Sequence, residues 1–144
     1  MKGRWLIQRE MPMLDELQIN TRRPLWIALS ELWLDTELDA GDLERIAHVM
    51  ADSALTIEEL RHVYLVEVAP VVSPNLLSPA GEWAGFDEEW LCSSIIENLR
   101  QRFWFTRFWS RCMPTRAIMT YATERHWTKL VELVEIYSHK NLAA

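Results

Sequence analysis

Apolar residues recur at helical spacing along most of this chain, and this period constrains the fold more than any other feature of the sequence. A helix buries one face when apolar side chains return every three or four positions, whereas a half-buried strand needs strict alternation. No strand-like alternation runs longer than four residues, and no internal repeat or low-complexity tract is present. The 144 residues therefore predict an all-α fold, a single compact domain of five or six helices.

Capping residues divide this period into separate helices. An N-cap side chain accepts a hydrogen bond from a free N–H group of the first helical turn. The predicted caps are Asp39 or Thr36, Thr56 in a capping box with Glu59, and Asp87. The predicted helices cover about residues 23–34 with Pro24 in the first turn, a segment ending near Asp52, 57–68, 88 to at most 113, 114–122, and a last segment around 127–137.

The predicted core follows from the apolar stripe of each helix. Its members are Leu25, Ala28, Leu29, Leu32, Trp33, Leu43, Ile46, Ala47, Met50, Leu60, Val63, Tyr64, Val68, Leu91, Ile95, Leu99, Trp127, Leu130, Val131, Val134 and Tyr137. One long connection, about residues 69–86, interrupts these stripes with three prolines and two glycines, so we expect no helix there. Connections of this length are uncommon in compact domains, and we expect it to be packed against the core or functional.

The formal net charge of −6 is spread unevenly along the chain. Residues 1–24 carry five basic and three acidic residues (+2), residues 25–99 carry two and fifteen (−13), and residues 100–144 carry eight and three (+5). The acidic middle region would repel phosphates, which disfavours nucleic acid as its partner. Its acidity favours a cationic partner, although solvated helix faces would have the same composition.

Histidine and cysteine positions match no catalytic or metal-binding spacing. His48 lies four positions before Asp52, and we interpret the two as a surface pair on a helix. Cys92 and Cys112 lack the context of a disulfide framework, so we expect both to be reduced thiols. The sequence thus predicts no metal site, no cofactor and no catalytic residue.

Glu67 interrupts the apolar run of the third helix. A carboxylate in that position is expected to be half-buried and hydrogen-bonded, and an amide of the connection 69–86 is the expected donor. An enzyme with an unrecognised helical site around Glu67 and His62 remains an alternative, because a general base also needs a carboxylate or an imidazole.

The segment 81–90 is the most distinctive of the chain, because it places carboxylates around indole and phenyl rings. Such a surface suits a partner rich in arginine or lysine, since aromatic side chains supply contact area and carboxylates steer association. The candidate partner-binding residues are Glu82, Trp83, Asp87, Glu88, Glu89 and Trp90. The alternative is that the rings only fix the long connection to the core.

The stretch 100–111 interleaves five aromatic residues with four arginines. On a helix these rings would spread more than halfway round, which favours burial in the core or in a homodimer interface over binding to nucleic acid or a membrane surface. We expect residues 1–13 to form a leader and residues 14–144 the domain, with basic aromatic helices over 103–144. The chain shows no export signal and no apolar run long enough to span a membrane, so we expect it in the cytoplasm.

The segments RRPLWIALS (22–30), LDTEL (34–38), PNLL (74–77) and AGEWAGFDEEW (80–90) resemble a family of small acidic bacterial helical proteins with no assigned reaction. The resemblance covers about residues 14–102. In size and character that family is similar to immunity proteins, which neutralise toxins of competing bacteria. The resemblance implies a binding protein rather than an enzyme, with a cationic cognate toxin as its partner; a homodimeric helical adaptor, joined through the aromatic tail, is a further alternative.

Overall fold

The structure, a computed structural model, describes residues 14–33, 37–72, 86–101 and 113–143, and in the last of these ranges the side chains from residue 123 on. The elements are α1 (Glu16–Ser30), the 3₁₀-helix η2 (Glu31–Trp33), α2 (Ala40–Asp52), α3 (Ile57–His62), the π-helix η3 (Val63–Val68), α4 (Ala69–Val72), α5 (Glu88–Arg100) and α7 (Met113–Ala143). All regular structure within the described ranges is helical, which confirms the all-α prediction.

The predicted caps lie where three of the helices begin. The Asp39 carboxylate accepts the N–H of Asp42 at 2.8 Å, Thr56 accepts that of Glu59 at 3.2 Å, and Asp87 accepts that of Trp90 at 2.7 Å. Each bond satisfies a first-turn N–H group that has no partner within the helix. These starts depend on neighbours three positions apart, which is why the sequence alone predicts them.

The first helix starts seven residues before its predicted position at residue 23. Asp15 caps it, since its carboxylate accepts the N–H of Gln18 at 2.7 Å and the Gln18 side chain accepts the N–H of Asp15 at 3.0 Å. Pro24 therefore lies inside α1 and not in its first turn, so the prediction for this boundary is wrong. A proline inside a helix costs about 3 kcal/mol, which the buried residues around Trp26 offset.

The third predicted helix is longer than the sequence suggests. It starts at Ile57 as predicted, but α3, η3 and α4 continue without a break to Val72, so residues 69–72 are helical and not part of a connection. The N–H of Ala69 bonds the carbonyl of Tyr64, five residues back, immediately before Pro70. Because proline clashes with the carbonyl four residues before it, a wide turn ending at Ala69 lets the helix pass Pro70. Residues 73–85 lie outside the described ranges.

The last two helices also differ in length from their predictions. Helix α5 ends at Arg100, where the N–H of Gln101 bonds the carbonyl of Glu97 at 3.1 Å, well short of residue 113. The two predicted final helices form one helix, α7, with Pro114 as its second residue. A proline there costs little because first-turn N–H groups have no partner within the helix. The aromatic stretch 103–111 and the expected leader 1–13 fall outside the described residues.

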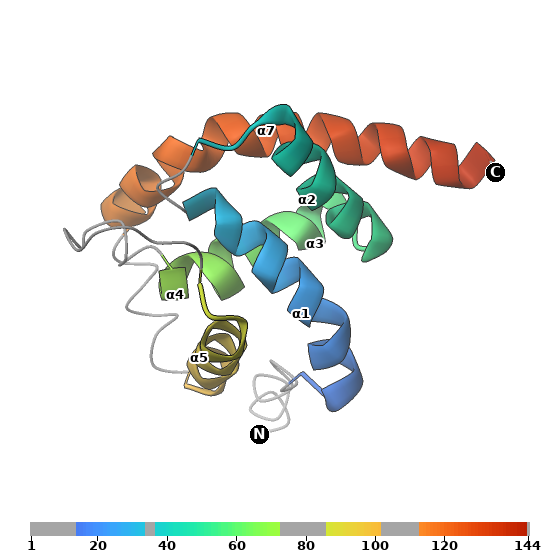
Figure 1. The fold of residues 1–144 in the computed structure, drawn as a ribbon. Coiled ribbons are helices and arrows are strands. Elements are labelled where there is room, and N and C mark those ends of the chain that lie inside the picture. Colours follow the sequence, from blue (N-terminus) through green and yellow to red (C-terminus); the bar gives the residue numbers. More distant parts are fainter. Residues whose placement is uncertain (1–13, 34–36, 73–85, 102–112, 144) are drawn as a thin grey trace, which may run out of the picture.

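The core is formed by buried residues of α1, η2, α2, the continuous helix from Ile57 to Val72, α5 and α7, with α7 packed against α2 and α5 against α1. Figure 1 shows α7 running across one side of the molecule against α2, with its C-terminal end extending beyond the other helices. The predicted stripes are confirmed: all their members are buried except Leu99, Val131 and Tyr137, which are partly buried and pack against the core. In the ranges described, none of the helices is apolar enough over a sufficient length to span a membrane.

Candidate functional site

The start of α5 places four of the six candidate binding residues on one exposed turn. Asp87 caps the helix, Glu88 and Glu89 occupy its first turn, and Trp90 follows. Carboxylates are favourable here because the N-terminus of a helix carries about half a positive charge. None of the three carboxylates forms an ion pair with another described residue. The other two candidates, Glu82 and Trp83, lie outside the described ranges.

Trp90 is the large aromatic side chain of this turn, and 47% of it is exposed. Its ring lies nearly parallel to that of Phe86, with 6.3 Å between the centroids and 17° between the planes. Its backbone N–H bonds the Asp87 carboxylate, so the residue is fixed at both backbone and ring. We call Phe86, Asp87, Glu88, Glu89 and Trp90 the α5 surface.

A buried thiol lies behind the α5 surface. Cys92 is a free cysteine, and burial raises the pKa of its thiol; the charge of Arg23 opposes this rise and that of Glu88 adds to it. A raised pKa keeps the sulfur protonated and unreactive at neutral pH, which is typical of a buried structural thiol. Helix α1, which carries Arg23, packs against α5. Cys112 falls outside the described residues.

Glu67 is buried far more deeply than expected, with 2% of its surface exposed. Its Oε1 accepts a hydrogen bond from Arg22, with which it forms an ion pair, and its Oε2 accepts one from Trp26 Nε1 at 2.8 Å. Both described donors lie on α1 and not in the connection 69–86, where the donor was expected; residues 73–85 of that connection lie outside the described ranges. A carboxylate held by a cation and a second donor is suited to joining helices, because both of its oxygens are occupied.

Sequence reasoning missed Arg22 and Trp26 as partners of Glu67. A signal was present, because the two residues lie four positions apart and so share one face of α1. A tryptophan on a buried face needs an acceptor for its indole N–H, and the carboxylate within the apolar run of the third helix could supply it. His62, the second residue of the enzyme alternative, is exposed at the end of α3.

Tyr64 connects the continuous helix from Ile57 to Val72 with α7. Its ring stacks between those of Trp33 and Trp127, with centroid distances of 4.9 and 4.6 Å, and its hydroxyl is hydrogen-bonded to that of Thr123. Burial raises the pKa of Tyr64 to about 12, although the bond to Thr123 opposes the rise. These contacts are internal and stabilise the fold.

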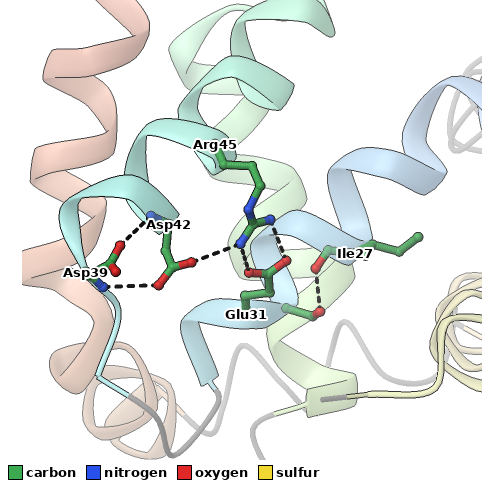
Figure 2. Close-up of polar contacts among 6 residues, drawn as sticks. Ile27, Glu31, Asp39, Asp42 and Arg45 are labelled. Atoms are coloured by element: carbon green, nitrogen blue, oxygen red, sulfur yellow. Dashed lines mark hydrogen bonds and ion pairs between the residues drawn. The ribbon is translucent and has the colours of Figure 1, made fainter. Parts of the chain in front are cut away.

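Ion pairs with Arg45 balance part of the negative charge of the middle region. Arg45 donates two hydrogen bonds to the carboxylate of Glu31, at 2.9 and 2.5 Å, and a longer one to Asp42 at 3.4 Å, as Figure 2 shows. The hydrogen bonds to Glu31 raise the pKa of Arg45 further above its usual value. The Asp42 carboxylate also accepts a hydrogen bond from the backbone N–H of Asp39. Glu31 in η2 and Asp42 in α2 therefore both have hydrogen-bond donors within the described structure. The α5 surface has no such described counterion.

The histidines show no metal site in the described part of the chain. His48 is exposed and stacks on Tyr137 of α7 with 3.9 Å between ring centroids, a contact that the predicted pairing with Asp52 did not include. Within the described ranges, no three residues of the types His, Cys, Asp and Glu are grouped so that they could hold a metal ion.

Comparison with known proteins gives one match. A family described as a domain of unknown function, DUF7079, matches residues 20–133, which include most of α1, all of α2 to α5 and two thirds of α7. No curated protein and no solved structure matches the chain.

Proposed function

Because the chain belongs to the DUF7079 family, whose description names no activity, we propose its function from its surface: it is an immunity-type protein that binds and neutralises a cognate bacterial toxin. It would bind the toxin through the α5 surface. A toxin that acts on nucleic acid has a cationic cleft for its substrate, and an acidic protein can occupy such a cleft.

The observation that carries this proposal is the half-exposed Trp90 beside three carboxylates without a described counterion. Aromatic residues in the centre of an interface contribute much of the binding free energy, whereas surrounding charges mainly accelerate association. The α5 surface combines both types of residue on one turn. The net charge of −6 would add long-range attraction to a cationic partner.

The environment of Glu67 supports a binding role over the enzyme alternative. A general base must be within hydrogen-bond reach of a substrate, and Glu67 is almost completely buried with both oxygens bonded to α1. On this reading the exposed α5 surface is the functional part of the protein and the buried polar groups hold the fold.

Kinetics with a candidate toxin test the proposal. The product of the neighbouring gene is co-expressed with this protein, and the complex is recovered by pull-down and measured at two salt concentrations. Neutralising Glu88 and Glu89 together to Gln should slow association about three- to tenfold at low salt and much less at high salt. Trp90→Ala should cost on the order of 2 kcal/mol of binding free energy, mainly through faster dissociation.

A matched control separates the α5 surface from net charge. Glu132→Gln with Glu135→Gln removes the same number of charges from exposed positions of α7 and should leave association near the wild-type rate. Thermal melting shows whether each variant is folded. The proposal is abandoned if no complex forms, or if a complex forms whose kinetics respond to neither the α5 variants nor salt.

A further inference from the structure

The ring of Trp90 is held in place before any partner arrives. Asp87 fixes its backbone N–H at 2.7 Å, and the half-buried Phe86 stacks against its ring one turn earlier. A free surface tryptophan would lose rotamer entropy on binding, at a cost of about 0.5–1.5 kcal/mol. The contact with Phe86 reduces this cost for Trp90, so its ring is partly preorganised for binding.

The described side chains of the α5 surface carry net negative charge despite their place at a helix start. The N-terminus of α5 contributes about half a positive charge, and Asp87, Glu88 and Glu89 contribute three negative charges. Among the described residues, Arg23 of α1 is close enough to act on the neighbouring Cys92 thiol, and no described ion pair joins it to these carboxylates. An exposed indole in a negative field attracts a cation to its face.

We propose that the ring of Trp90, held by Phe86, receives an arginine guanidinium group of the partner rather than a lysine ammonium group. This inference rests on the proposed function and names the side chain that the partner must present. A guanidinium group is flat and weakly hydrated, so it can lie on an indole and still donate two hydrogen bonds to one carboxylate. An ammonium group is a compact and strongly hydrated charge, so it loses more hydration on the ring and lacks the flat fork that matches a carboxylate.

The test uses the free full-length protein and three capped pentapeptides that differ only at two positions. One peptide carries two arginines, one two lysines, and one two citrullines, which keep the arginine shape without its charge. Binding is followed at low salt by the indole N–H signal of Trp90, which is assigned from its absence in Trp90→Leu. We expect the arginine peptide to bind about two- to fivefold more tightly than the lysine peptide, and the citrulline peptide not to bind.

Two variants show whether the preference for arginine depends on Trp90. Trp90→Leu, in which binding is followed by the backbone N–H signals of Glu88 and Glu89, should lose most of the preference for arginine, because the carboxylates alone discriminate less between the two cations. Glu132→Gln with Glu135→Gln should keep the preference of the wild type. Equal affinities in the wild type, no detectable binding, or binding that leaves the Trp90 signal unchanged would each overturn the inference.

The outcome is independent of the toxin experiment. A failed peptide preference beside a toxin complex that depends on Trp90 would remove the arginine assignment and leave the proposed function intact. A clear arginine preference without any toxin complex would support the binding of arginine at Trp90 and contradict the proposed function.

Discussion

Trp26 of α1 donates its indole N–H to the carboxylate of Glu67 across 2.8 Å, and both residues are almost completely buried. The same carboxylate forms an ion pair with Arg22, which is partly exposed. One side chain of the continuous helix from Ile57 to Val72 therefore bonds two residues that lie one turn apart on α1. Buried charges of this kind stabilise a fold only while both partners are present, because each alone would remain desolvated.

Arg22→Met should therefore destabilise the protein by about 3–5 kcal/mol, since it leaves the Glu67 carboxylate buried and unpaired. The double variant Arg22→Met with Glu67→Met should lose clearly less stability than the two single variants lose together, because no charge is then left in the core. Urea denaturation measures each free energy of unfolding. Additive single effects would show that the ion pair has no coupling energy.

Tyr64 predicts a loss of stability at alkaline pH. Its pKa is raised to about 12 in the folded protein against an ordinary value of 10.0, so the folded state favours the protonated hydroxyl. The resulting stability is present below pH 10, falls as the pH rises from 10 to 12, and amounts to about 2–3 kcal/mol. Tyr64→Phe should be less stable at neutral pH by about 1 kcal/mol for the lost hydrogen bond to Thr123. Its stability should also fall less than that of the wild type between pH 10 and 12 in urea titrations.

The capping box at Thr56 predicts a loss of stability at acidic pH. The hydrogen bonds from Thr56 to the Glu59 carboxylate lower its pKa below the ordinary value of 4.5. A lowered pKa means that the bonds contribute fully above pH 4.5 and are lost as the pH falls through the folded value. Thr56→Ala should cost about 1 kcal/mol at pH 7 and reduce this acid dependence. An identical acid dependence in both proteins would rule out the Thr56 hydroxyl as its source.

Ala54 predicts a stabilising substitution. It follows the end of α2 with a φ of 59°, in the left-handed region that favours glycine. Ala54→Gly should raise the free energy of unfolding by up to about 1 kcal/mol, because it relieves the strain on the Cβ atom. Ala51→Gly, three residues earlier and inside the helix, should lower it by a similar amount. Thermal melting distinguishes the two, and a destabilised Ala54→Gly would contradict the assigned strain.

Local signals account for what the sequence predicted correctly. The caps at Asp39, Thr56 and Asp87 involve groups three residues apart, and each apolar stripe belongs to one helix. For the same reason the position of the α5 carboxylates beside Trp90 could be predicted. Their lack of described counterions could not, because it depends on which helices surround α5.

Long-range packing explains the errors. The partner of Glu67 lies 45 positions earlier in the chain, beyond any local pattern. Pro24 and Pro70 both fit rules that place proline at helix ends, yet tertiary contacts of their neighbours keep both inside helices. Pro114 follows the rule, but the length of α7 depends on the core contacts of residues such as Trp127 and Leu130, more than a dozen positions away.

The wide turn Val63–Val68 has a consequence for how the length of this helix can vary. A π turn holds about one residue more than an ordinary α-helical turn. The apolar faces before and after it therefore align as they would in an α-helix that is one residue shorter. A one-residue deletion within this turn should leave Leu60 and Val72 facing the same core, whereas the same deletion within α2 would rotate Met50 by about 100° away from it. Among relatives of this chain, length differences inside helices should therefore concentrate at this turn.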